Sequence, residues 1–188
     1  MEQVFLISGK AYHGKDSTAK FLKDKLPEGK TLILHYADYL KLIAKMYLGW
    51  SGQKDEEGRN ILQWLGTERV RLELKRPLFW VKSVCDAIEI TSDKYDYFCV
   101  PDCRFPNEVY YPKAAFSGKV TTIKVVRTNF ASTLTEEQKR HPSEVALNGF
   151  VFDYTIESVG GLDQLGIQVD NFLERYRLDN AIPNTREV

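Results

Sequence analysis

The chain has 188 residues, 43% of them hydrophobic, and its 26 basic residues balance its 26 acidic residues. This length and composition predict one compact domain over residues 1–188. The charge balance provides no broad positive field, so we expect no nucleic-acid partner. No window approaches the roughly 18 apolar residues that span a bilayer, and no basic start precedes an apolar run. We therefore expect a cytoplasmic protein without a membrane partner.

Apolar runs and helical spacing predict alternating strands and helices in the first part of the chain. Residues 4–8 (VFLIS) suit a buried parallel strand, and apolar residues recur at helical spacing between Lys15 and Leu26. Residues 31–36 (TLILHY) form a second strand candidate, and Asp38 is placed to cap the helix after it. We then predict a polar loop at 51–58, a helix at 59–74 and a helix at 77–90.

The rest of the chain continues the alternation. Strands are predicted at residues 95–100, 119–126 and 152–156, and a last amphipathic helix follows Gly160 and Gly161, with a frayed tail after Arg177. The polar connection at 127–144 is typical of a mobile binding loop. This order predicts an α/β fold with a five-stranded, mainly parallel sheet covered by helices on both faces. Ligands then bind at the carboxyl ends of the strands, where the polar clusters fall.

Residues 9–15 (GKAYHGK) have the G-x-x-x-x-G-K spacing of a phosphate-binding loop. The glycines permit a tight turn whose backbone N–H groups point at phosphate oxygens, and the following helix adds the positive end of its dipole. Lys15 would neutralise the phosphate that is transferred. We expect a nucleoside triphosphate to contact Gly9, Lys10, Ala11, Tyr12, His13, Gly14, Lys15, Asp16, Ser17 and Thr18.

Asp16 departs from the usual pattern, in which Ser or Thr follows the lysine and binds magnesium. Ser17 or Thr18 can supply that hydroxyl, while Asp16 caps the helix or holds a metal-bound water. Asp102 ends a buried strand, where a carboxylate commonly orients Mg²⁺; its alternative role is to cap a turn. Asp16, Ser17 and Asp102 are therefore the candidate metal ligands, and the sequence leaves the choice among them open.

Arginines at strand ends and in the long connection suit phosphoryl transfer, which needs positioning and positive charge more than a base. Planar guanidinium groups grip phosphates with two hydrogen bonds. We predict that Lys15, Arg104, Arg127 and Arg140 are catalytic. The alternative for each arginine is a solvated surface charge.

Taken together, these motifs resemble the phage-type deoxynucleoside monophosphate kinases, which are relatives of adenylate and guanylate kinases. The Gly-Lys-Asp loop and the segment Asp102–Glu108 (DCRFPNE) are the most specific parts. The similarity spans most of the chain and rests on Ile7-Ser8-Gly9-Lys10 with Gly14-Lys15-Asp16-Ser17, Tyr36-Ala37-Asp38 with Leu40-Lys41, Leu62-Gln63 with Gly66-Thr67-Glu68 and Arg71, Trp80-Val81, the Asp102–Glu108 segment, His141-Pro142-Ser143-Glu144, and Phe152-Asp153-Tyr154-Thr155-Ile156.

The resemblance implies a three-layer P-loop NTPase fold that transfers the γ-phosphoryl group of ATP, with Mg²⁺, to a deoxynucleoside monophosphate. It implies a helical acceptor-binding insert at about residues 38–90 and a lid at about 127–146 that excludes water. If the source is a virus, the expected location is the host cytoplasm. The residues that the resemblance directs to the substrate are Asp38, Lys41, Gln63, Arg71, Arg104 and Glu144; for Glu144 a surface or capping carboxylate is the alternative.

Two other functions fit the same motifs. Phosphomevalonate kinases share the Gly-Lys-Asp loop, and adenylate kinases share the layout, so another small-molecule kinase is the nearest alternative. A non-catalytic module that holds a nucleotide as a switch is the second. The sequence leaves open the nucleobase, the choice between deoxyribose and ribose, and whether the protein is a homodimer.

Overall fold

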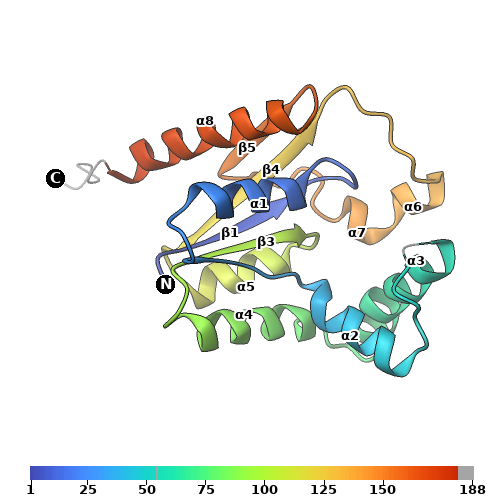
Figure 1. Cartoon of the computed structure of the whole chain (residues 1–188). Coiled ribbons are helices and arrows are strands. Elements are labelled where there is room, and N and C mark those ends of the chain that lie inside the picture. The colour runs from blue at the N-terminus through green and yellow to red at the C-terminus, as the bar shows by residue number, and fades with distance from the viewer. Residues whose placement is uncertain (54, 182–188) are drawn as a thin grey trace.

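Strand β1 lies at the centre of a five-stranded sheet in the order β2-β3-β1-β4-β5, and every neighbouring pair is parallel (Figure 1). The computed structural model describes residues 1–53 and 55–181. The strands are β1 (Gln3–Ser8), β2 (Thr31–Ile33), β3 (Tyr97–Cys103), β4 (Val120–Arg127) and β5 (Tyr154–Ser158). The helices are α1 (Lys15–Lys25), α2 (Ala37–Tyr47), α3 (Glu56–Gln63), the π-helix η1 (Trp64–Glu73), α4 (Phe79–Thr91), α5 (Asn107–Ala115), α6 (Glu136–Arg140), α7 (Pro142–Val145) and α8 (Leu162–Ala181).

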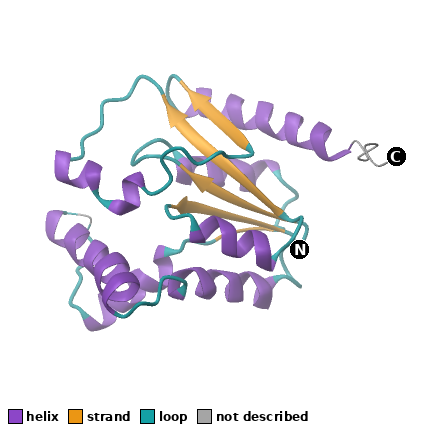
Figure 2. Cartoon of the chain, turned by 180° about the vertical axis from the view of Figure 1, so that it is seen from behind, coloured by secondary structure: helices purple, strands orange, loops and turns teal. Residues whose placement is uncertain are grey.

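Helices cover both faces of the sheet, as Figures 1 and 2 show from opposite sides. Because side chains alternate along a strand, β1 directs Val4 and Leu6 to the face covered by α4 and α5. It directs Phe5 and Ile7 to the face covered by α1 and α8. All six residues of β1 are buried, which confirms the prediction of a buried parallel strand.

A third apolar cluster lies beyond the carboxyl ends of the strands. It joins α2, η1 and the start of α4 through Leu40, Ala44, Leu65, Val70 and Trp80. On the other side of the same sheet edge, a long loop leads from β4 to α6 and α7 (Figure 2). The two helical regions therefore flank the edge where a parallel sheet binds its ligands.

The start of α2 corrects one prediction. The second strand ends at Ile33 rather than residue 36, and α2 begins at Ala37, so Asp38 lies within the first turn and is not the N-cap. Asp102 provides the cap instead, because its two carboxylate oxygens accept hydrogen bonds from the amides of Tyr36 and Ala37, at 2.9 and 3.0 Å. The partner lies on another strand, and the local pattern could not reveal it.

Two helices also differ from the prediction. The helix expected at 59–74 begins at Glu56, because the Asp55 carboxylate accepts the Gly58 amide at 2.8 Å and caps it. From Trp64 the helix continues in π geometry to Glu73, a widening that often occurs at functional sites. Helix α5 was not predicted, since it is short and contains Pro112, which interrupts a helical pattern.

The C-terminal region was predicted with smaller errors. Strand β5 is displaced two residues from its predicted start, and α8 continues through Ala181 rather than fraying after Arg177. Positions 182–188 of the predicted tail lie outside the described residues. No helix within residues 1–53 and 55–181 combines the length and apolar character that crossing a membrane requires.

Candidate functional site

The phosphate loop, residues 9–17, connects β1 to α1 in a conformation that glycine makes accessible. Gly9 and Gly14 have φ angles of 150° and 93°. A Cβ atom on Gly9 would lie 2.4 Å from the carbonyl oxygen of Val125 on β4, so only glycine fits there. Tyr12 takes φ 64° although it carries a side chain. The loop therefore adopts the tight turn that the spacing predicts, with α1 directly behind it.

Lys15 lies within this loop rather than at the surface. Its side chain is buried, and Nζ donates a hydrogen bond of 2.7 Å to the carbonyl oxygen of Lys10. Burial, followed by the positive charge of Arg104, lowers the pKa of Lys15 to about 7. An anion bound at the loop would favour the charged ammonium again.

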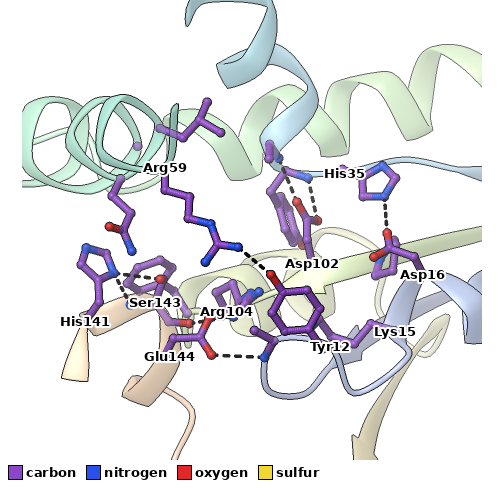
Figure 3. Close-up of a pocket in the computed structure, with 18 of the residues that line it drawn as sticks. Tyr12, Lys15, Asp16, His35, Arg59, Asp102, Arg104, His141, Ser143 and Glu144 are labelled. Atoms are coloured by element: carbon purple, nitrogen blue, oxygen red, sulfur yellow. Dashed lines mark hydrogen bonds and ion pairs between the residues drawn. The ribbon is translucent and has the colours of Figure 1, made fainter. Parts of the chain in front are cut away.

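A carboxylate from α7 already lies against the loop. Glu144 accepts a hydrogen bond from the Ala11 amide at 3.3 Å, and its other oxygen pairs with the guanidinium of Arg104 (Figure 3). Lys10 reaches the same helix, donating to the carbonyl oxygen of Glu144 and, at 2.8 Å, to Asn148 Oδ1. One loop amide, that of Ala11, and the Arg104 guanidinium thus converge on one negative group, as such groups do around a bound phosphate.

His35 joins the far side of the loop to α2. Its Nε2 lies 3.0 Å from Asp16 Oδ1, and its Nδ1 lies 3.3 Å from Asp38 Oδ2. These two hydrogen bonds raise the pKa of His35 to about 9, so the ring is positively charged at neutral pH. Sequence reasoning missed His35, although its place at the end of the TLILHY run, at the ligand-binding edge, was a usable signal.

Arg71 also lines the cavity and has a buried acidic partner. Its Nη2 atom is 2.5 Å from Glu108 Oε1, and the two side chains are 9% and 2% exposed. The guanidinium also lies 4.2 Å from the centre of the Phe105 ring. Burial raises the pKa of Glu108 to about 7, against the opposing effect of Arg71. Glu108 was not predicted as a site residue.

Two contacts cross the cavity between its flanking regions. The hydroxyl of Tyr12, in the phosphate loop, accepts a 2.5 Å hydrogen bond from Arg59 on α3. His141, which precedes α7, has its Nε2 atom 3.3 Å from Glu68 Oε1 on η1. Nδ1 of the same ring accepts the Ser143 amide and caps α7, so Nε2 carries the proton that Glu68 accepts.

Most of these side chains line one cavity of about 860 Å³. The predicted site residues that line it are Ala11, Tyr12, Gly14, Lys15, Asp16, Ser17, Lys41, Gln63, Arg71, Asp102, Arg104, Arg127 and Glu144. It is also lined by residues that were not predicted, among them His35, Leu40, Trp80, Phe105, Glu108, Phe130 and His141. The cavity therefore brings together the phosphate loop, Arg71 of η1 and Arg104, which directly follows β3.

Other predicted residues lie elsewhere. Gly9, Lys10 and His13 line a neighbouring cavity of about 240 Å³ behind the loop. Nδ1 of His13 accepts the Arg127 amide at 3.2 Å, and burial, followed by the charge of Lys15, lowers the pKa of the ring. His13 thus attaches the loop to the end of β4.

Thr18, Asp38 and Arg140 do not line the main cavity. Thr18 is fully buried, and both its amide and its hydroxyl donate to the Gly14 carbonyl oxygen. The Asp38 carboxylate binds His35 and lies 3.5 Å from Lys41. Arg140 is exposed at the end of α6.

The oxygen ligands near the loop fit Mg²⁺ better than a transition metal. Ser17, Asp16 and Asp102 offer one hydroxyl and two carboxylates, the hard donors that Mg²⁺ prefers. No group of three or more His, Cys, Asp or Glu side chains suited to a metal occurs among residues 1–53 and 55–181. Mg²⁺ commonly takes one or two protein ligands and completes its shell with water and substrate phosphates, so this set is compatible with it.

Comparison with known proteins supports the fold. The tunicamycin resistance protein of Deinococcus radiodurans is 17% identical with a TM-score of 0.52, and dephospho-CoA kinase from Campylobacter jejuni is 13% identical with a TM-score of 0.50. Each alignment covers 92% of this chain and 96% of the other. No model of a known protein family matches the chain, and no curated protein matches it. The predicted five-stranded parallel sheet with helices on both faces is confirmed, and the chain shares this fold with the two structures.

Proposed function

We propose that this protein is a deoxynucleoside monophosphate kinase, which transfers the γ-phosphoryl group of ATP to the monophosphate and releases ADP and the diphosphate. One observation carries the proposal: the phosphate loop and the buried pair of Arg71 and Glu108 line the same cavity. A volume of about 860 Å³ lies in the range of small-molecule sites and leaves room for two ligands. The sequence resemblance supplies the class of acceptor.

The donor side consists of the loop amides, Lys15 and the start of α1. These groups would hold the triphosphate in place of the Glu144 carboxylate, which now accepts the Ala11 amide. Bound Mg²⁺, held by Ser17 with Asp16 or Asp102, would neutralise charge on the β- and γ-phosphates. Arg127, whose guanidinium lies 4.8 Å from the Phe130 ring at the cavity wall, adds positive charge on this side.

The acceptor side consists of Lys41, Gln63, Arg71 and Arg104. The guanidinium groups would hold the acceptor phosphate so that one of its oxygens forms a bond to the γ-phosphorus while the bond to the bridging oxygen of ADP breaks. A phosphate acceptor is already an anion and needs no general base. Closure of the region that bears α6 and α7 would exclude water, and only such a movement brings Arg140 to the site.

The test is a screen of purified protein with ATP and Mg²⁺ against each deoxynucleotide, each ribonucleotide and phosphomevalonate. We expect formation of a deoxynucleoside diphosphate, detected directly by chromatography. Turnover of phosphomevalonate alone would make the protein a different small-molecule kinase. If no nucleotide accepts phosphate, the proposal fails.

Replacing Arg104 distinguishes a kinase from a nucleotide-dependent switch. Arg104→Ala should raise the acceptor KM by about 10-fold or more, since a hydrogen bond to a charged group contributes about 1.5–3 kcal/mol. The affinity for ATP, measured by calorimetry, should change little. Arg69→Ala is the matched control, because Arg69 pairs with Glu73 on η1 and does not line the cavity. If the protein is a nucleotide-dependent switch, neither substitution should change its affinity for an acceptor.

A further inference from the structure

Glu108 is a buried carboxylate at the cavity wall. It belongs neither to the phosphate loop nor to the predicted acceptor-binding residues, so the proposed function assigns it no role. It lies in the first turn of α5 and is 2% exposed. Oε2 accepts the backbone amides of Arg104 and Phe105, at 2.6 and 3.0 Å, while Oε1 faces Arg71. One side chain therefore fixes both the backbone that carries Arg104 and the guanidinium of Arg71.

Arg71 is held on several sides by this arrangement. Besides Glu108, its Nε donates to the Gly66 carbonyl oxygen and its Nη1 to the Pro77 carbonyl oxygen, each at 3.2 Å. The Phe105 ring packs against the guanidinium plane. A guanidinium has five N–H donors, and these three bonds leave one N–H on each Nη atom. A pair of N–H groups on neighbouring nitrogens is the fork that binds two oxygens of one phosphate.

A buried ion pair is an expensive way to stabilise a fold, because both charges lose water and an apolar pair often packs as stably. Its position at a cavity wall gives it another use. A guanidinium that is already oriented loses little conformational freedom when an anion binds, so the entropic cost of binding is small.

We propose that Glu108 is a positioning residue, which holds the Arg71 fork and the Arg104 backbone ready for the phosphate of the acceptor. This inference rests on the proposed function, in which both arginines contact that phosphate. The inference goes beyond the proposed function because it assigns the orientation of both arginines to Glu108, which itself contacts no substrate.

Glu108→Gln tests the proposal with a change of nearly equal volume. The amide oxygen can still accept the backbone N–H groups, but the negative charge facing Arg71 is lost. The acceptor KM should rise by about 10-fold, as for loss of a charge-assisted hydrogen bond, with ATP affinity unchanged. In an Arg71→Ala background, Glu108→Gln should raise KM little further, because two residues that act through one contact are not additive. Independent effects that add would contradict the proposal.

The dependence of the acceptor KM on pH gives a second readout. Glu108 faces the charged or titratable groups of Arg71, Asp102 and Arg104, and of Tyr36 and Cys103. Since its pKa is raised to about 7, the pairing with Arg71 is lost as the pH falls through that value. The wild-type KM should therefore rise below about pH 7 more steeply than that of Glu108→Gln. Titration of the acceptor phosphate affects the KM of both proteins equally, so it cancels in the comparison. If the acceptor KM of the two proteins changes with pH in parallel, the proposal is wrong.

A measurement on the Arg71 side chain keeps this inference separate from the proposed function. Restricted rotation of the guanidinium should give distinct Nη proton signals in the NMR spectrum of the wild-type protein, and these signals should merge in Glu108→Gln. If the wild-type protein phosphorylates no nucleotide but the signals merge, the proposed function fails and the positioning role stands. If the signals stay distinct in Glu108→Gln, the positioning role is wrong whatever the substrate.

Discussion

Asp153 shows how a single carboxylate can join two strands at the edge of the sheet. It precedes β5, and its Oδ2 accepts both the amide and the hydroxyl of Thr122 on β4, at 2.8 and 2.7 Å. Lys113 on α5 lies 3.1 Å from the same oxygen. Burial opposes the charged form, but the hydrogen bonds from Thr122 and Lys113 outweigh it and lower the pKa of Asp153. The carboxylate is therefore charged under all ordinary conditions.

The lowered pKa predicts a stability difference with a definite sign. The charged Asp153 carboxylate stabilises the folded protein fully at pH values above its ordinary pKa of 3.8. This stabilisation is lost as the pH falls through the lower pKa that Asp153 has in the folded protein. Asp153→Asn should unfold at a lower urea concentration than the wild type at pH 7, and the gap should narrow below about pH 4. Asp93→Asn, at an exposed position, is the control and should show no such trend. A gap that widens in acid would exclude this explanation.

Among the elements, the start of α3 packs closely against the chain that precedes it. Trp50 Nε1 donates to the Gln53 carbonyl oxygen at 2.8 Å, and Asp55 caps the helix through the amide of Gly58. A Cβ atom on Gly58 would lie 2.1 Å from the Gln53 oxygen and 2.6 Å from Trp50 Nε1. The chain can approach itself this closely only because residue 58 has no side chain.

Gly58→Ala should therefore lower the free energy of unfolding by about 1–3 kcal/mol, the usual cost of overpacking. The measurement is the thermal unfolding midpoint. Gly161→Ala is the control, since no atom lies within 4 Å of a Cβ added there, and it should leave the midpoint nearly unchanged. Equal midpoints for the two variants would show that the loop before α3 adjusts freely.

The order and type of most elements could be predicted, because apolar runs and helical spacing are local signals. The phosphate loop could be predicted for the same reason, since its chemistry lies in consecutive residues. The contacts of Glu108 with Arg71 and of His35 with Asp16 span 37 and 19 residues and depend on how the elements pack, so the sequence pattern did not reveal them. The π geometry of η1 left no periodic signal distinct from that of an α-helix.

At the scale of the molecule, the sheet carries two helical regions that meet over its edge. One consists of α2, α3 and η1, and the other of α6 and α7 (Figure 1). His141 and Glu68 join them directly, beside the contact of Tyr12 with Arg59. In a kinase, these two contacts would help to hold the helical regions together when the cavity closes over the γ-phosphate.

Glu68→Ala should weaken that closure without disturbing the cap of α7, which His141 provides through its other nitrogen. We expect more ATP to be hydrolysed by water for each acceptor phosphorylated, because water reaches the γ-phosphate more often. The measurement compares ADP formed with diphosphate formed at saturating acceptor. Glu73→Ala, which removes the partner of Arg69 on the same helix, is the control. An unchanged ratio in Glu68→Ala would mean that the bridge does not contribute to closure.

The central place of β1 also has a consequence for biosynthesis. Val4 pairs with Phe98 on one side and with Val120 on the other, so β1 is synthesised before both of the strands that pair with it. Until β4 has emerged, this apolar segment lacks one of its two partner strands, and such exposed segments are prone to aggregation. Nascent chains arrested before β3 (Tyr97–Cys103) has left the exit tunnel should accordingly bind chaperones more strongly than chains arrested after β4 (Val120–Arg127) has left it.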